Sequence, residues 1–161
     1  MLIAITRDIS PALADCELTH LTRQPIDVER ARAQHRDYER LLIEAGCRVE
    51  RLAAGADMPD SVFLEDAAVV LDEIAIITRP GAVSRRPETA AVAARLRAYR
   101  DVRSIEPPAT MDGGDVLIVG KRVFVGCSRR TNRGTGSRWR RTTVPSTRCA
   151  PATTLARCVG P

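Results

Sequence analysis

The stretch from Asp60 to Thr78, DSVFLEDAAVVLDEIAIIT, carries the strongest fold signal in this chain. An acidic segment is followed by two apolar runs that flank a polar Asp72-Glu73 turn, and this pattern predicts a β-hairpin. The same order returns at residues 112–125, DGGDVLIVGKRVFV, where two apolar runs flank a Gly120-Lys121 turn. An arginine-bearing loop follows each hairpin, so the sequence contains two copies of one unit.

The spacing of the two copies predicts the fold. Asp66 and Asp115, which open the hairpins, lie 49 positions apart. After the first hairpin, Pro87 at a first helical position predicts a helix through Leu96, and a strand is expected near residues 102–105. A repeat of two strands, a helix and a strand predicts an α/β fold in the form of a partial, radially repeated propeller of ββαβ units. Two visible copies are too few to close a ring.

The N-terminal part is expected to add a strand, a helix and a second strand. Residues 2–6 form a short apolar run, and residues 47–52 alternate as a strand does. Between them, Asp27 is placed to cap a helix that Gly46 ends. The N-terminal part therefore has the same mixed α/β character as the repeat.

Length and composition exclude several classes. The 161 residues suffice for one domain with a core, with 44% hydrophobic and only 3% aromatic residues. No apolar stretch approaches the roughly 20 residues that cross a bilayer, and the N-terminus lacks the pattern of a signal peptide, so a cytoplasmic location is expected. The five cysteines are scattered, which favours free thiols over a metal site or a disulfide scaffold.

The positive charge is confined to the C-terminal end. The net charge is +5, but all 20 acidic residues lie at or before Asp115, and residues 127–161 hold eight arginines and no acid. We therefore divide the chain into an incomplete propeller domain, residues 1–133, and an Arg/Thr/Pro-rich tail, residues 134–161. The tail is interpreted in three ways: a basic arm that binds polyanions, a disordered tail without function, or a segment translated out of frame, which we favour.

Carboxylates are the first candidate site residues. Asp60, Glu65 and Asp66 lie within seven positions, and if this segment continues as a strand, Asp60 and Asp66 share one face while Glu65 points to the other. Asp112 is a further carboxylate, placed before the second hairpin. The adjoining Gly113-Gly114 allows close approach to a ligand. Carboxylates can hold a planar guanidinium group through paired hydrogen bonds. The alternative is that they are loop caps and solvated charges.

Arginines and histidines complete the candidate set. Arg85-Arg86 and Arg129-Arg130 recur after the two hairpins, so one arginine from each loop is expected to bind a substrate carboxylate. The alternative is a set of solvated surface pairs of little energetic value. His20 is a candidate base, or else an exposed loop residue, and His35 within the first helix is expected at the surface.

Together these stretches resemble the dimethylarginine dimethylaminohydrolase family, within the superfamily that modifies guanidino groups. The resemblance covers about residues 1–133 and implies a pentein-like, five-bladed α/β propeller of which this chain holds the N-terminal part. It rests on several motifs in the family's order: residues 18–20, 60–66, 77–82 with 84–86, 111–116 and 126–132.

The resemblance implies hydrolysis of N-methylated arginine to citrulline and methylamine or dimethylamine, without a cofactor. Asp60 and Asp66 would hold the guanidinium of the substrate. Glu65 would lie against the main-chain amine of the substrate or the wall of the site. Whether a monomethylated, a dimethylated or an unmodified arginine is preferred stays open, as does the oligomeric state.

The remaining family roles fall on four further residues. Arg85 and Arg130 would bind the substrate carboxylate, and Leu18 would belong to a lid loop. Asp112 takes the place of the acidic residue beside the catalytic histidine. The expected partner is thus a small molecule, methylated arginine or arginine, with no membrane or nucleic acid required.

The reactive pair of the family is not found in this sequence. The family's histidine and cysteine lie downstream of the Arg-Thr-Asn motif, whereas this sequence has no histidine after His35. Cys149 and Cys158 do not lie in a segment like that of the family's nucleophile. We therefore expect a hydrolase-derived chain without turnover, with a non-catalytic binder of arginine-like ligands as the alternative and polyanion binding through the tail as a weaker one.

Overall fold

The computed structural model describes residues 1–18, 22–120 and 122–132. They fall into two compact units, of which the first comprises Met1–Leu64 and the second begins at Glu65. The expectations for His20, Lys121, Cys149, Cys158 and the tail concern residues outside those ranges. No helix within them is long and apolar enough to cross a membrane.

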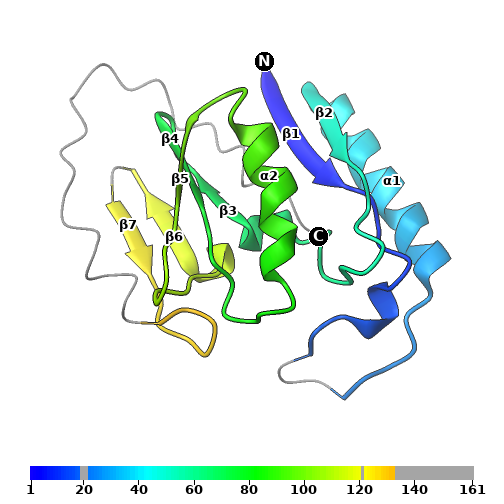
Figure 1. Ribbon diagram of the computed structural model, residues 1–161. Helices are drawn as coiled ribbons and strands as arrows, with labels where there is room; N and C mark the ends of the chain where they lie inside the picture. The colour runs from blue at the N-terminus through cyan, green and yellow to red at the C-terminus, as the bar shows by residue number, and fades with distance from the viewer. Residues whose placement is uncertain (19–21, 121, 133–161) are drawn as a thin grey trace. The chain divides into compact units, whose positions relative to one another are not determined.

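The first unit is a β-α-β arrangement. Strand β1 (Leu2–Arg7) and strand β2 (Cys47–Leu52) pair in parallel, with helix α1 (Val28–Glu44) between them in the chain (Figure 1). Parallel neighbours need a long crossover connection, which α1 supplies. The predicted strand, helix and strand are therefore confirmed, and their bounds lie within one or two residues of those expected.

Both ends of α1 follow local sequence signals. The Asp27 carboxylate accepts a hydrogen bond of 2.9 Å from the backbone N–H of Arg30, so it caps the first turn as predicted. Gly46 follows the helix with φ +85°, a left-handed conformation that glycine adopts without steric cost. Local sequence signals thus determine where the helix begins and ends.

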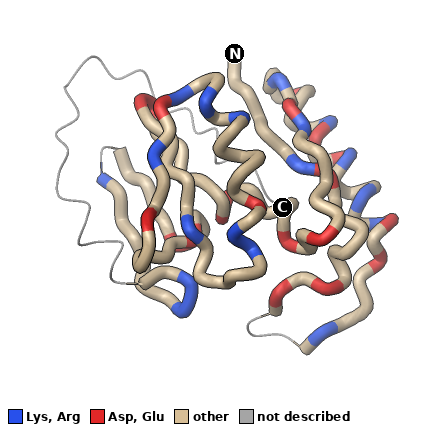
Figure 2. Tube along the Cα trace, in the orientation of Figure 1, with Lys and Arg blue, Asp and Glu red and all other residues tan. Residues whose placement is uncertain are grey.

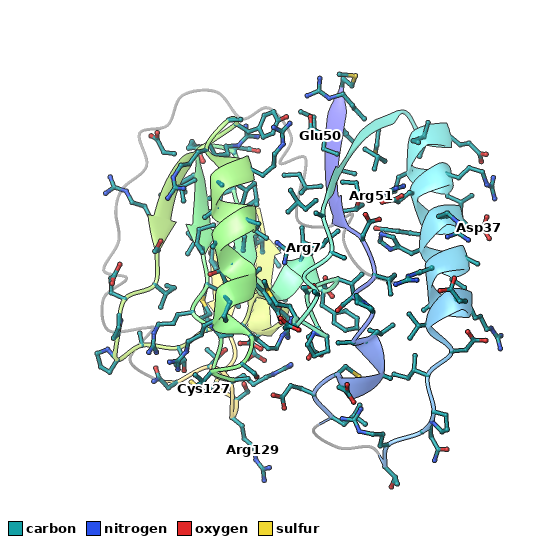
Figure 3. The ribbon with its side chains drawn as sticks, turned by 45° about the vertical axis from the view of Figure 1, so that its right-hand side comes forward. Arg7, Asp37, Glu50, Arg51, Cys127 and Arg129 are labelled. Carbon is teal, nitrogen blue, oxygen red and sulfur yellow. The ribbon has the colours of Figure 1, made fainter. Side chains whose placement is uncertain are left out.

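The inner face of α1 contains an acid that hydrophobic periodicity does not predict. Glu39 is buried and accepts hydrogen bonds from Thr6 Oγ1 at 2.6 Å and from Arg51 Nε at 2.9 Å. Burial acts to raise the pKa of Glu39, but the hydrogen bonds from Arg51 and Thr6 outweigh it and the pKa is lowered. Figure 3 shows Arg51 on the side of β2 near the helix and Asp37 on the outer side of α1.

The surface position expected for His35 is wrong. Its side chain is only 12% exposed, and Nε2 lies 3.3 Å from the buried Glu39 carboxylate one helical turn away. By contrast, Leu41 and Ile43 are more than half exposed, on a helix along which charges of both signs alternate (Figure 2). The helix therefore turns part of its polar sequence inward, where β1 and β2 supply hydrogen-bond partners.

The second unit contains the repeat. Its first part is a three-stranded sheet of order β3-β4-β5, antiparallel between β3 and β4 and parallel between β4 and β5, with helix α2 connecting β4 to β5. Its second part is the antiparallel pair β6–β7. The bounds are β3 Ala68–Val70, β4 Ile74–Ile77, α2 Thr89–Leu96, β5 Asp101–Ser104, β6 Val116–Val119 and β7 Arg122–Val125.

The two hairpins share one register. The pair Val116↔Val125 lies 48 positions after the pair Ala68↔Ile77, and the pair Leu117↔Phe124 lies 48 positions after Val69↔Ile76. Short 3-10 helices, Leu64–Asp66 and Gly113–Asp115, precede the two hairpins at equivalent points. The predicted ββαβ unit is confirmed for the first copy, and the described residues of the second copy include its hairpin.

The acidic segment does not continue as a strand. Residues 60–62 form turns, and Leu64–Asp66 is a 3-10 helix rather than extended chain. The alternation of faces therefore does not apply to Asp60, Glu65 and Asp66. In a 3-10 helix about three residues complete one turn. Consecutive side chains such as Glu65 and Asp66 therefore project in different directions around the helix axis.

Candidate functional site

A buried arginine lies at the centre of the candidate site in the second unit. Arg85 is 5% exposed, and its Nη1 lies 2.7 Å from Asp66 Oδ2. Its Nη2 lies 3.0 Å from Glu88 Oε2, and its Nε donates to both oxygens of that carboxylate at 3.2 Å. The two acids hold the pKa of Arg85 above its usual range although burial opposes this. Arg85 is therefore a fixed cation between two buried carboxylates.

Glu88 is a site residue that the sequence pattern did not indicate. It is 3% exposed and belongs to the 3-10 helix Arg86–Glu88 that leads into α2. The available signal was its position three residues after Arg85, a spacing at which helical side chains meet. Its role is to complete the electrostatic shell of Arg85.

A third buried carboxylate comes from the next repeat. Asp112 is 1% exposed, and its Oδ1 accepts a hydrogen bond of 3.2 Å from the backbone N–H of Gly81. Arg130 Nε lies 3.3 Å from Asp112 Oδ2, but the two groups are not aligned for a hydrogen bond. Burial raises the pKa of Asp112, and the negative charge of Asp66 adds to this effect.

A glycine lets the two repeats meet at this point. A Cβ atom on Gly113 would overlap the carbonyl oxygen of Glu65, so only glycine permits this approach of one backbone to the other. The next residue, Gly114, donates its backbone N–H to Asp66 Oδ1 at 3.2 Å. The predicted close approach of the Gly113-Gly114 pair is therefore directed at the Glu65-Asp66 segment, and it brings Asp112 to the same place.

Glu65 is the least satisfied acid of the group. Its Oε2 atom is buried and has no hydrogen-bond partner. Burial raises the pKa of Glu65 to about 7, with a further contribution from the charge of Asp66. A positive charge close to this carboxyl group would lower its pKa, so the group would lose its proton at neutral pH.

The charge balance of the cluster suits a cation. Four acids, Glu65, Asp66, Glu88 and Asp112, are wholly or largely buried, whereas the buried Arg85 pairs with two of them, Asp66 and Glu88. Arg130 adds a second positive charge, but its side chain is 44% exposed. Buried carboxylate oxygens that lack a donor are costly and are normally paired. A planar guanidinium ion, with N–H groups on several edges, could supply the missing donors.

The loop that carries Arg130 is held by hydroxyl groups. Asp115 Oδ2 accepts hydrogen bonds from Ser128 Oγ at 2.7 Å and from Thr131 Oγ1 at 2.5 Å. Thr131, which is 1% exposed, also accepts from the backbone N–H of Asp112 at 3.1 Å. Asp115 therefore positions the Arg130 loop, and Arg129 in the same loop is exposed and points away from it (Figure 3).

Two predicted site residues belong to the first unit. The Asp60 carboxylate, 5% exposed, accepts a hydrogen bond of 3.0 Å from the backbone N–H of Glu17. The neighbouring Leu18 is 38% exposed. Asp60 thus anchors the backbone at Glu17, next to Leu18, an arrangement that the sequence pattern does not indicate.

The second unit brings together most of the predicted set. Glu65, Asp66, Arg85, Asp112 and Arg130 form one connected group of ion pairs and electrostatic contacts. The donors of Arg85 face acids of the protein, whereas the expected partner of Arg85 was a substrate carboxylate. Its role in substrate binding, like those of the other candidates, remains a prediction.

No protein-family model matches this chain. Several curated proteins match it over part of their own length. A dimethylarginine dimethylaminohydrolase of Streptomyces coelicolor is 44% identical over 130 residues, 80% of this chain and 50% of the relative. Another, of Pseudomonas aeruginosa, is 39% identical over 108 residues, 66% of this chain and 42% of the relative. The chain therefore spans about half the length of the curated relatives it matches.

Solved structures show the same relationship. A dimethylarginine dimethylaminohydrolase with a histidine-to-glycine change, in an adduct with S-methyl-L-thiocitrulline, matches with a TM-score of 0.79 and 36% identity over 85% of this chain and 55% of that one. A cysteine-to-serine variant from Pseudomonas aeruginosa, complexed with citrulline, matches with a TM-score of 0.76 and 36% identity over 83% and 53%. The N-terminal domain of ArgZ, an arginine dihydrolase, shares the fold with a TM-score of 0.72 at 20% identity, over 81% of this chain and 51% of that one.

Proposed function

We propose a function from the premise that this chain belongs to the dimethylarginine dimethylaminohydrolase family, of which it represents the N-terminal part. The chain supplies the guanidinium-holding side of a hydrolase that acts on amidine C–N bonds. Its ligand is an N-methylated arginine, and the reaction of the complete site yields citrulline and methylamine or dimethylamine. A cytoplasmic location is part of the same proposal.

The observation that carries this proposal is the surplus of buried carboxyl groups in the second unit. Glu65 Oε2 and Asp112 Oδ2 are buried and have no hydrogen bond. Both acids also have a raised pKa, because burial and the charge of Asp66 disfavour their ionised forms. A bound guanidinium ion would reverse both effects, since it provides N–H donors and a compensating positive charge.

The chemistry assigned to these residues is binding and orientation. The carboxylates hold the guanidinium group in one plane and so leave its central carbon open from above or below. In the reaction of the family, a cysteine thiolate forms a bond to that carbon, the C–N bond to the methylated nitrogen breaks, and a histidine gives its proton to the departing amine. Water then cleaves the carbon–sulfur bond, which releases citrulline and restores the thiol.

We propose further that these 161 residues bind the ligand without turning it over. The sequence has no histidine after His35, and both reactive residues of the family follow the Arg-Thr-Asn motif. The carboxylate cluster itself has neither a thiol nor an imidazole among its hydrogen-bond and ion-pair partners in the described residues. The purified chain should release no citrulline from dimethylarginine; release above a control without protein would disprove this part of the proposal.

The binding part is tested by calorimetric titration of the purified chain with dimethylarginine at several pH values. Affinity should rise as the pH increases through about 7, because the cation binds better to ionised Glu65. Citrulline has the same length but a neutral ureido group, so its weaker binding should show no such rise. The Glu65→Gln variant should bind dimethylarginine about tenfold less tightly at pH 8, a loss of about 1.4 kcal/mol, and should lose the pH dependence.

Glu73→Gln is the matched control. Glu73 lies in the exposed turn between β3 and β4, so the variant removes one carboxylate without touching the site. It should bind like the unmodified chain. Absence of binding by a folded chain, or an equal effect of the two substitutions, would count against a guanidinium site at Glu65.

A further inference from the structure

Arg85 presents different parts of its guanidinium group to its two acids. Glu88 accepts hydrogen bonds from Nε at 3.2 Å through both of its oxygens, and from Nη2 at 3.0 Å through Oε2. Asp66 accepts a hydrogen bond from Nη1 at 2.7 Å through Oδ2. Glu88 therefore binds one edge of the guanidinium plane, whereas Asp66 meets the nitrogen that lies outside this edge.

A backbone turn holds Arg85 and Glu88 together. The backbone N–H of Glu88 donates to the carbonyl oxygen of Arg85 at 3.1 Å, at the start of the 3-10 helix Arg86–Glu88. The next arginine, Arg86, has a different partner, because its Nε donates to the carbonyl oxygen of Pro80 at 3.1 Å. The local chain thus fixes which of the two consecutive arginines pairs with Glu88.

The two acids that pair with Arg85 differ in their surroundings. The side chain of Asp66 is 13% exposed, and that of Glu88 is 3% exposed. Asp66 also acts directly on the other acids of the site, since its charge raises the pKa of Glu65 and of Asp112. Asp66 therefore belongs to the acids that meet the proposed ligand, whereas Glu88 influences them through Arg85.

One cation serves two carboxylates in this arrangement. Arg85 carries one positive charge and Asp66 and Glu88 together carry two negative ones, so the three groups have a net charge of −1. Without the charge of Glu88, Arg85 and Asp66 would neutralise each other, and a bound cation would gain less from Asp66. Buried charges are screened much less than exposed ones, so this loss would be felt at the ligand.

We propose that Glu88 determines the specificity of the site for a cation: it compensates the charge of Arg85 and so leaves the charge of Asp66 to the guanidinium group of the ligand. Glu88 does this as a positioning residue, because it acts through Arg85. The inference rests on the proposed function and names what makes that site prefer its substrate to its product. Dimethylarginine is cationic, whereas citrulline is neutral and gains nothing from the charge of Asp66.

The test compares the affinities of the 161-residue chain for dimethylarginine and citrulline, measured by calorimetric titration at one pH. Both ligands have the same α-amine and α-carboxylate, so a contact between Arg85 and the ligand carboxylate cancels in the ratio of the two affinities. In Glu88→Gln the preference for dimethylarginine should fall about tenfold, because a buried negative charge close to Asp66 is lost. The affinity for citrulline should stay unchanged.

Two further variants make this result specific. Glu106→Gln is the matched control, since Glu106 is an exposed acid that follows β5, and it should leave the ratio unchanged. The double variant Arg85→Met with Glu88→Leu removes the cation and its counter-ion together, and apolar replacement of a buried ion pair is often tolerated. Asp66 keeps its charge in this variant, so the ratio should not fall below that of the unmodified chain.

The outcomes separate this inference from the proposed function. Equal losses of affinity for both ligands in Glu88→Gln would mean that Glu88 only holds the fold, and they would overturn the inference while the proposed function stands. A fall of the ratio in the double variant would overturn it as well, and this readout remains if Glu88→Gln does not fold. If the unmodified chain binds neither ligand, the proposed function and the inference fail together.

Discussion

Hairpins β3–β4 and β6–β7 have the same register, but they differ in their surroundings. Val69 and Ile76 of the first pair are 4% and 3% exposed, whereas Leu117 and Phe124 at the equivalent positions are 55% and 51% exposed. The apolar pattern specifies a strand in both cases. Whether that strand becomes part of a core depends on the segment that follows it, because a sheet face is buried only by another element.

The acidic residues before the two hairpins differ as well. Asp66 pairs with the buried Arg85, while Asp115 accepts hydrogen bonds from the hydroxyl groups of Ser128 and Thr131. The first repeat therefore uses its carboxylate in a charged network, and the second uses its carboxylate to hold a loop. Similar residues at equivalent places therefore make different interactions, because the residues around them differ.

The largest difference is expected at the arginines of the two repeats. Arg85→Ala should lower the free energy of unfolding by about 3–5 kcal/mol, because it leaves Asp66 and Glu88 buried without a counter-ion. Arg130→Ala should cost at most about 1 kcal/mol, since Arg130 is nearly half exposed. Urea denaturation followed by circular dichroism measures both. Equal losses would mean that the two repeats are electrostatically alike.

A second comparison concerns the apolar pairs. Ile76→Ala should cost about 2–5 kcal/mol of unfolding free energy because it opens a cavity in a closed core. Phe124→Ala should change the stability of the isolated chain by no more than about 0.5 kcal/mol, as surface substitutions do. A large loss at Phe124 in the same urea experiment would show that its face is already covered in solution.

The junction of the repeats can be tested at its glycines. Gly113→Ala should lower the free energy of unfolding by about 1–3 kcal/mol, because the added Cβ overlaps the carbonyl oxygen of Glu65 and the backbones must separate. Gly126→Ala is the control, since its Cβ would meet its nearest neighbour at an ordinary 3.6 Å. If Gly113→Ala proves as mild as the control, the two segments do not approach as closely as described.

A further comparison concerns the titration of Glu65. Its pKa in the folded chain is about 7, above the ordinary value of 4.5, so the folded state binds the proton more tightly than the unfolded state. The stability it contributes is therefore fully present below about pH 4.5 and is lost as the pH rises through 7. Urea denaturation at pH 5 and pH 8 should show this loss in the unmodified chain and not in Glu65→Gln.

The sequence by itself determined the elements and their order. Asp27 and Gly46 mark the ends of α1, and the Asp72-Glu73 turn separates β3 from β4, because capping and turn formation depend on neighbouring residues. The 49-residue spacing of Asp66 and Asp115 predicted the repeat, which the common register of the hairpins confirms. Glu65, Asp66 and Asp112 were likewise found as a group from their pattern alone.

Only the tertiary structure decided which of these groups are buried and with whom they pair. Glu88 belongs to the site because it pairs with Arg85. Glu39 is buried because Thr6 and Arg51, on the adjoining strands, donate hydrogen bonds to it. The same holds for Phe124, which remains exposed although its counterpart Ile76 is buried. Burial and ion pairing depend on contacts with residues that are distant in the chain. The local propensity of a residue does not include these contacts.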